Sequence, residues 1–345
     1  MKNTSHKRYI LLSSLISSLV FIGYVAAVYV IDPAGVNNRF DLGLVRNPGL
    51  AFRTQKFAEM NTFKPDTVML GGSRIHFLDT DDVKKYTHDR VYNIGLSGST
   101  LREQYAFLSY AIAHFEIKHV IIGVNLYPFS ENPYTADDSD FDETLLHSGF
   151  TLQKQVEHYL EVPVKKYLKQ KWESPLYKNG SRTAYNQKIF IDGKPWEERE
   201  KKSNDFYREI YSQNMEWGDS GLKIFEKTVQ LCKKNNIDLK VFTTAIYASQ
   251  LQLLCDLNET GILYRWKREL AAITPYWDFM YLNSVTTDPA NYIDPSHLRQ
   301  ERGYLYFAKI FHDKETVVPH DFGVYVNEET VDAHLAGTGA VCGSH

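Results

Sequence analysis

The segment DPSH places a carboxylate and an imidazole three residues apart, a spacing that can support acyl-transfer chemistry. Pro295 fixes one backbone torsion between Asp294 and His297. The carboxylate can then orient one ring nitrogen while the other faces a reacting hydroxyl, as in the base of a serine triad. The alternative is a turn in which Asp294 caps the following helix and His297 is a solvated surface residue.

A matching hydroxyl stands in VMLGGSRIHF, where an apolar run stops at Gly71-Gly72-Ser73. This pattern predicts a buried strand that enters a tight turn. Ser73 would lie at the mouth of a sheet, where α/β proteins place ligands and nucleophiles. An ordinary strand-to-helix connection has the same pattern, and the G-x-S-x-G elbow is absent because Ile75 replaces its second glycine.

Two further turns follow predicted strands and carry hydrogen-bond donors. NIGLSGS offers the Gly98 N–H and GVN offers the Asn125 amide, both suited to a developing oxyanion. The alternatives are turn geometry for Gly98 and a capping or core hydrogen bond for Asn125. Arg74 could position an anionic substrate or pair with a core carboxylate. His76 belongs to no paired motif, so we expect it to be structural.

The elements that must position these residues alternate between strands and helices. Short strands, each followed by a polar turn, are predicted at 66–71, 90–94, 119–124, 238–246 and 276–282. Amphipathic helices are predicted at 101–115, 221–237 and 263–273, and a closing helix follows the DPSH loop. This order predicts a three-layer α/β/α, flavodoxin-like domain with a parallel sheet.

The predicted organisation has six parts. Residues 1–8 form a cytoplasmic N-terminus, 9–31 a transmembrane anchor, 32–60 a stalk, 61–315 the α/β domain, about 130–217 a cap inserted into it, and 316–345 a tail without a fold signal. Aromatic residues of the cap could line a glycan groove, although packing onto the core is the favoured interpretation. These residues are Trp172, Tyr177, Tyr185 and Trp196.

The N-terminal segment has the composition of a membrane anchor. Lys2, Lys7 and Arg8 precede 23 residues, 9–31, without a charge. Such a helix spans about 34 Å, enough for the roughly 30 Å hydrocarbon core. The flanking bases place the N-terminus in the cytoplasm and the rest of the chain outside. A cleaved signal peptide is the alternative, but the run exceeds a typical h-region of about 7–15 residues.

Charge and cysteine content limit the possible partners. The net charge of −3 gives no broad basic field for nucleic acid. We find no metal-site spacing and expect no metal or cofactor. Cys232 and Cys255 could form a disulfide that leaves Cys342 unpaired, whereas two buried thiols and a tail cysteine are the slightly favoured alternative.

Taken in order, the four segments resemble the motif blocks of the SGNH, or GDSL-type, hydrolase superfamily. GGSR at Ser73, NIGLSGST at Gly98, GVN at Asn125 and DPSH at Asp294 and His297 match the four blocks between about residues 65 and 312. Two positions depart from the family pattern: Gly72 replaces the usual acidic residue before the nucleophile, and Leu126 replaces the common Asp after the asparagine.

The resemblance implies a Ser73–His297–Asp294 triad, with oxyanion donors from Ser73, Gly98 and Asn125. Gly-x-Ser-Arg behind an N-terminal anchor is similar to membrane-tethered members of bacterial envelopes, such as the DltD proteins and the AlgJ- and AlgX-like proteins. That branch implies a single-pass protein of the inner membrane whose outer domain acylates an envelope glycopolymer beside a multipass membrane O-acyltransferase. An esterase or deacetylase and an inactive scaffold for a membrane partner are the alternatives.

Overall fold

The structure is a computed structural model that describes residues 2–32, 52–133, 141–148, 151, 154, 194–213, 215–337, 341 and 342. It divides into two units, Met1–Thr62 with Thr144–Gly180 and Phe63–Glu143 with Ser181–His345. Most of the predicted cap, including Trp172, Tyr177 and Tyr185, lies outside the described residues. So do residues 33–51 of the predicted stalk.

The first unit contains a long apolar helix, α1 (Lys2–Ile31). Its segment His6–Ile31 has 26 residues and a mean hydropathy of 2.2. At 1.5 Å per residue it is about 39 Å long, which exceeds the hydrocarbon core of a bilayer. The helix is therefore long and apolar enough to cross a membrane. A second helix, α2 (Phe52–Phe63), occupies positions that the sequence predicted to be an irregular stalk.

The second unit is built on a six-stranded sheet with the order β2-β1-β3-β4-β5-β8. Its first five strands in the chain are parallel: β1 (Thr67–Gly71), β2 (Val91–Asn93), β3 (His119–Val124), β4 (Asp238–Thr243) and β5 (Tyr276–Asp278). Strand order reverses at β1, because β2 lies on one side of it and β3 on the other. This is the flavodoxin-like order, whose ligands bind at the carboxyl ends beside the reversal.

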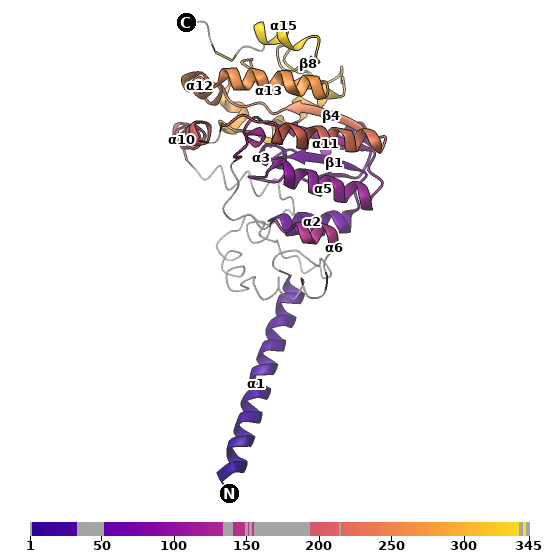
Figure 1. The fold of residues 1–345 in the computed structure, drawn as a ribbon, viewed down its shortest axis with the longest axis vertical. Helices are drawn as coiled ribbons and strands as arrows, with labels where there is room; N and C mark the ends of the chain where they lie inside the picture. Colours follow the sequence, from indigo (N-terminus) through magenta and orange to yellow (C-terminus); the bar gives the residue numbers. More distant parts are fainter. Residues whose placement is uncertain are drawn as a thin grey trace. The chain divides into compact units, whose positions relative to one another are not determined.

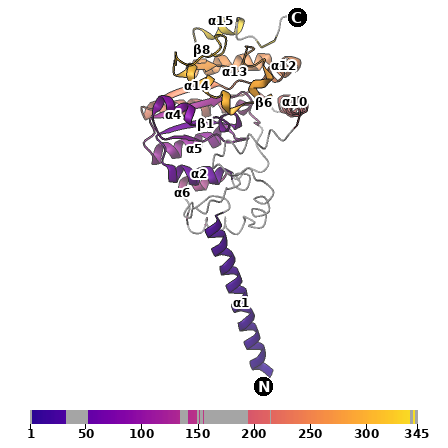
Figure 2. The same cartoon turned by 180° about the vertical axis from the view of Figure 1, so that it is seen from behind.

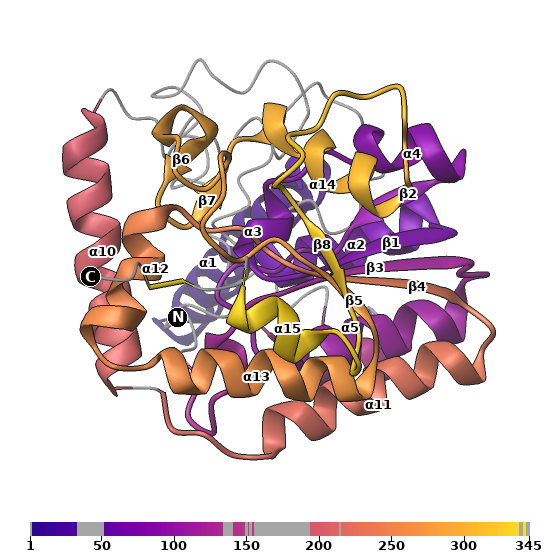
Figure 3. The same ribbon diagram turned by 90° about the horizontal axis from the view of Figure 1, so that it is seen from above.

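Helices cover both faces of this sheet. Figure 3 shows α4 (Asp81–Thr87) and α14 (Tyr304–Ile310) on one face and α5 (Leu101–His114) and α11 (Ser220–Lys234) on the other. The strand β1 is buried along its whole length, as expected for a parallel strand covered on both sides. The predicted three-layer α/β/α architecture is thus confirmed (Figure 1).

The tail, in which the sequence carries no fold signal after about residue 317, contributes to the fold. The strand β8 (Val324–Val326) pairs antiparallel with β5 at the sheet edge, and α15 (Val331–Ala336) packs against α13 (Thr260–Ile273). Both tail elements are too short to show a periodic pattern, and their partners lie far away in the sequence.

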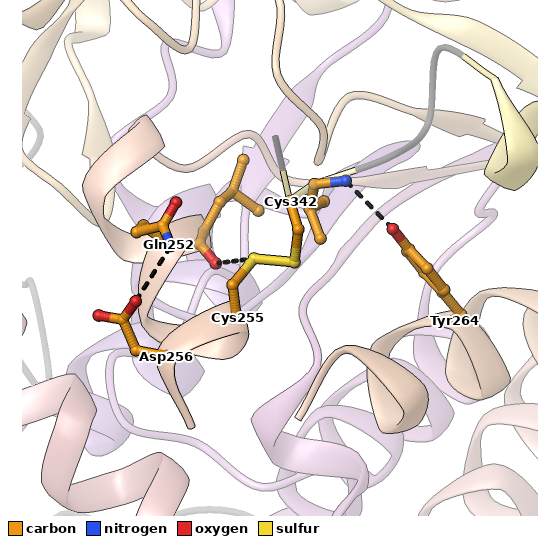
Figure 4. The surroundings of a disulfide bond; sticks show 7 residues. Gln252, Cys255, Asp256, Tyr264 and Cys342 are labelled. Atoms are coloured by element: carbon orange, nitrogen blue, oxygen red, sulfur yellow. Dashed lines mark hydrogen bonds between the residues drawn. A yellow bond between two sulfur atoms is a disulfide. The ribbon is translucent and has the colours of Figure 1, made fainter. Parts of the chain in front are cut away.

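Neither predicted arrangement of the cysteines is correct. Cys255, in α12 (Ala248–Asp256), forms a disulfide with Cys342, 87 residues further along the chain (Figure 4). Cys232 is a buried thiol of α11, and burial raises its pKa to about 12. The Tyr264 hydroxyl accepts a hydrogen bond from the Val341 N–H and so holds the chain next to the disulfide.

A buried charge network joins the tail to the sheet. Asp278 accepts hydrogen bonds from Lys267 Nζ over 2.7 Å and Thr243 Oγ1 over 2.6 Å, and the His334 Nε2 lies 2.8 Å from the same carboxylate. Burial disfavours the charge of Asp278, but Lys267 and His334 lower its pKa to about 2. The network therefore fixes α13 and α15 against the end of β5.

We expect Lys267→Met to reduce the free energy of unfolding by about 3–5 kcal/mol, because Asp278 would remain buried without its permanent cation. Urea titration of the detergent-solubilised chain, followed by tryptophan fluorescence, measures this loss. Because the pKa of Asp278 falls from 3.8 to about 2 on folding, its ionisation contributes stability above about pH 4. That contribution disappears as the pH falls towards 2, so the difference between variant and wild type must narrow there.

The matched control for this substitution is Lys223→Met. Lys223 forms an exposed ion pair with Asp219 on the surface of α11, and such pairs add little to stability. Equal losses in the two variants would contradict a specific contribution of the buried network.

Candidate active site

The strand β1 ends in a glycine that its surroundings require. Gly71 has φ +154°, and a Cβ there would lie 2.5 Å from the Gly123 carbonyl oxygen and 2.5 Å from Ile75 Cγ1. Gly71 and Gly123 are register partners at the carboxyl ends of β1 and β3. The short helix α3 (Ser73–His76) therefore starts directly over these strand ends, and Ser73 occupies its first position.

Asp294 and His297 face each other across a hairpin. The strand β6 (Tyr292–Asp294) pairs antiparallel with β7 (His297–Leu298), and Asp294 is the register partner of His297. Side chains of directly opposed residues project from the same face. Pro295 and Ser296 form the turn. Asp294 is thus a strand residue and caps no helix, and His297 is 8 % exposed, so the alternative of a solvated histidine is wrong.

The hairpin brings His297 to Ser73. His297 Nε2 lies 2.8 Å from Ser73 Oγ, and His297 Nδ1 lies 2.9 and 3.0 Å from the two oxygens of Asp294. A neutral ring with its proton on Nδ1 donates to Asp294 and accepts from the serine hydroxyl. The three side chains predicted to act together therefore form one hydrogen-bonded chain, although Ser73 and His297 are 224 residues apart.

The carboxylate of Asp294 is held ionised inside the protein. Burial opposes its charge, but His297 and the backbone N–H groups of Ser296 and His297 outweigh burial and lower the pKa of Asp294 below its usual value. These N–H groups donate to Asp294 Oδ1 over 2.8 and 3.1 Å. The Phe77 ring meets the imidazole edge to face, with centroids 4.9 Å apart. Rotation of the imidazole is therefore restricted by both contacts.

Gly98 lies in the loop that follows β2. The loop is tied to the end of β1 by a hydrogen bond from the Leu96 N–H to the Gly71 carbonyl, 2.9 Å long. It also packs against α3, since a Cβ on Gly95 would lie 2.3 Å from the backbone nitrogen of His76. Gly98 itself has φ +61°, in the left-handed region that favours glycine. The loop thus carries Gly98 next to the strand that delivers Ser73.

Asn125 directly follows β3 and is buried. Its Nδ2 would lie 3.9 Å from a Cβ built on Gly72, and the Tyr127 hydroxyl would lie 4.0 Å from the same point. The amide therefore faces the residue that precedes Ser73. Since Gly72 has no side chain, an acyl oxygen meets no steric obstacle from residue 72 itself.

Arg74 is buried behind the serine, with no carboxylate partner among the described residues. Its Nε donates to Ser296 Oγ over 3.1 Å and its Nη1 donates to Thr244 Oγ1 over 3.2 Å. Burial opposes its charge, but the surrounding tyrosines raise the pKa of Arg74. Of the two alternatives for Arg74, pairing with a core carboxylate is therefore not found among the described residues.

Three other features complete the surroundings of the site. Trp196 packs its ring against Tyr247, with centroids 5.0 Å apart, in agreement with the favoured packing interpretation. His76 is buried in α3. Among the described residues, no group of three or more His, Cys, Asp or Glu side chains could hold a metal ion.

Three residues that contact the site were not predicted from the sequence: Thr244, Ser296 and Tyr207. Ser296 lies inside the DPSH motif, so its position next to His297 could have indicated a place in the site. Thr244 and Tyr207 contact the site from 170 and 89 residues away along the chain, and no local pattern marks them.

Comparison with known proteins gives little beyond this geometry. No family model and no curated protein matches the chain. One solved structure that the chain matches is from Bacteroides fragilis and is described as that of a "putative acylhydrolase". It has 14 % sequence identity and a TM-score of 0.35, and the match covers 75 % of this chain and 93 % of that chain.

The two adjacent glycines allow a matched test of the turn. We expect Gly71→Ala to reduce the free energy of unfolding by roughly 1–3 kcal/mol, because its Cβ would collide with backbone and the φ angle disfavours alanine. Gly72→Ala meets only ordinary contacts of 3.9 and 4.0 Å, and its unfolding free energy should change by less than about 0.5 kcal/mol. Urea titration measures both values. A Gly72→Ala loss as large as that of Gly71→Ala would refute this account of the turn.

Proposed function

We propose that this protein cleaves acyl esters through a covalent acyl-Ser73 intermediate, as an enzyme of the SGNH type. The observation that carries the proposal is the continuous hydrogen-bonded chain from Ser73 Oγ through His297 to Asp294. The order of the four motif segments and the flavodoxin-like sheet support the same assignment. The position of Ser73 and Asn125 beside the reversal of strand order supports it further.

The proposed first step forms the acyl-enzyme. Ser73 Oγ attacks the carbonyl carbon of the donor ester while its proton moves to His297 Nε2. Asp294 stabilises the resulting imidazolium, whose other proton stays on Nδ1. The tetrahedral intermediate then collapses, the ester C–O bond breaks, and the Nε2 proton moves to the leaving oxygen. The N–H groups of Ser73 and Gly98 and the Asn125 amide are the proposed oxyanion donors, each worth about 3–4 kcal/mol.

The second step distinguishes transfer from hydrolysis. A hydroxyl acceptor gives its proton to His297 Nε2 and attacks the acyl carbonyl, and Ser73 Oγ recovers the proton as it leaves. A sugar hydroxyl as acceptor makes the protein an O-acyltransferase, whereas water makes it an esterase. We propose transfer to a cell-envelope glycopolymer, because an anchored enzyme outside the membrane can meet both a membrane-bound acyl donor and an envelope glycan.

The proposed location is the outer side of a bacterial inner membrane, with α1 as a single-pass anchor and the N-terminus in the cytoplasm. Two independent features support it. The helix α1 is long and apolar enough to span a bilayer and follows basic residues. The Cys255–Cys342 disulfide belongs to an oxidising compartment. By resemblance, the acyl donor would come from a multipass membrane O-acyltransferase.

The esterase alternative keeps the same residues and needs only access of water to the acyl-enzyme. A scaffold without catalysis is the second alternative, and the departure at Gly72 is its main support. Retention of the serine, histidine and aspartate at hydrogen-bonding distance argues against a scaffold. These alternatives differ in what happens to an acyl group at Ser73.

We expect a fluorophosphonate to label Ser73 of the detergent-solubilised chain, as detected by peptide mass spectrometry. Ser73→Ala should abolish the adduct, and His297→Ala should slow labelling by about 10⁴-fold or more, since the general base is lost. Asp294→Asn should slow it by a similar factor, because the amide keeps an acceptor for the backbone N–H groups but loses the charge that stabilises the imidazolium and the acceptors that fix its tautomer. Ser130→Ala is the control, since it removes a buried serine whose hydroxyl donates to the Glu216 carbonyl. A folded wild-type chain without an adduct would favour the scaffold.

Transfer and hydrolysis are separated by following an acyl-Ser73 enzyme with and without oligosaccharide acceptors. Acylated glycan with little free acid supports the transferase, and free acid at an unchanged rate supports the esterase.

The disulfide gives a test of the compartment. Cells are lysed in denaturant with a thiol-alkylating reagent present and no reductant. Under these conditions we expect only one of the 3 cysteines, Cys232, to be modified. All three should be modified after reduction, and mass spectrometry reads the difference. Modification of all three without a reductant would place the domain in a reducing compartment and contradict the proposed topology.

A further inference from the structure

We propose that Arg74 and Tyr207 are positioning residues that hold His297 against Ser73 by fixing the side chain of Ser296. This inference rests on the proposed chemistry of Ser73 and identifies what keeps its base in place. Ser296 Oγ accepts a hydrogen bond from Arg74 Nε over 3.1 Å and donates one to the Tyr207 hydroxyl over 2.7 Å. Ser296 is fully buried and immediately precedes His297.

The place of Ser296 in the chain allows its side chain to control the position of the His297 ring. It lies in the two-residue turn between Asp294 and His297, and its own N–H donates to Asp294 Oδ1. Any rotation of the turn would therefore displace the carboxylate and the imidazole together. The hydrogen bonds at Ser296 Oγ resist that rotation.

Arg74 connects this turn directly to the nucleophile. It follows Ser73 in α3, so its bond to Ser296 spans the same gap that His297 Nε2 spans to Ser73 Oγ. Its second bond goes to Thr244 just after β4, and the Thr244 N–H donates to the Val124 carbonyl at the end of β3. These two bonds fix the Arg74 guanidinium relative to the ends of β3 and β4.

Tyr207 connects the turn to α10 (Trp196–Gln213). The same helix reaches the hairpin through Arg199, whose Nη1 donates to the Ile293 carbonyl, and through the contact of Trp196 with Tyr247. Figure 2 shows α10 beside β6, in agreement with their backbone contacts. Because the Tyr247 N–H donates to the Pro295 carbonyl over 2.8 Å, both residues of the turn are held.

The chemistry of the cluster suits a guanidinium better than an ammonium. Arg74 also lies over the Tyr207 ring, 5.8 Å from its centroid, while its planar fork serves two hydroxyls in different directions. A lysine would keep the charge without this fork. Binding of a substrate anion by Arg74 is the competing role, and it predicts a different kinetic effect.

The test uses the full-length, detergent-solubilised chain and three variants, Ser296→Ala, Tyr207→Phe and Arg74→Lys. Ser130→Ala and Tyr281→Phe are matched controls, since each removes a buried hydroxyl that donates to a carbonyl away from the hairpin. The first readout is the ¹⁵N spectrum of the His297 ring, identified by its loss in His297→Ala. The second is the rate of fluorophosphonate labelling of Ser73, and the third is kcat and KM for a neutral and an anionic aryl ester.

We expect wild type and both controls to show a neutral His297 with its proton on Nδ1. The three variants should show a mixture of tautomers, a labelling rate reduced about 10- to 100-fold, and a lower kcat with little change in KM for either ester. A single Nδ1–H tautomer and wild-type labelling in all three variants would overturn the inference. A rise in KM confined to the anionic ester would overturn it in favour of substrate binding by Arg74.

The proposed function and this inference fail in different ways. If wild type is not labelled but the variants alter the His297 tautomer, positioning by Ser296 stands and acyl-serine chemistry falls. If the tautomer is unaltered as well, both are refuted.

Discussion

The close approach of β1 and β3 at their carboxyl ends is the constraint on which the candidate site depends. A side chain on Gly71 would strike Gly123, and one on Gly123 would lie 2.1 Å from Ile75 Cδ1. Without side chains at both positions, α3 can begin immediately beyond β1 and cover the strand ends. Ser73 then stands where strand order reverses, with the loop after β2 on one side and Asn125 on the other.

Two of the buried carboxylates in the second unit, Asp278 and Asp294, have their charges compensated in different ways. Asp278 faces Lys267, a permanent cation, so their attraction is constant and contributes to stability. Asp294 faces His297, which in the proposed mechanism accepts the proton of Ser73. Its two backbone donors keep the carboxylate ionised in the meantime. Only the second arrangement offers stabilisation that increases along a reaction.

Local patterns in the sequence were sufficient for the fold class and for the residues of the hydrogen-bonded chain. The turn at Ser73 and the Asp294-x-x-His297 spacing are short-range signals, and the βαβ order gave the parallel sheet. The β6–β7 hairpin, β8 and α15 were not predicted, because strands of two or three residues and a helix of six residues show no periodic pattern in the sequence. The Cys255–Cys342 pairing depends on how the tail folds and cannot be read from spacing.

The helix α10 lies in the segment that was predicted to be an inserted cap, yet it contacts the hairpin of the candidate site. A core that was complete without this segment would supply its own partners to Ser296 and to the β6 backbone. Here Tyr207 and Arg199 of α10 supply them, and α10 belongs to the same unit as the sheet. Any force that displaces α10 therefore acts on the turn between Asp294 and His297. Because Arg74 binds the same Ser296 hydroxyl, the imidazole is positioned jointly by the nucleophile's own helix and by α10.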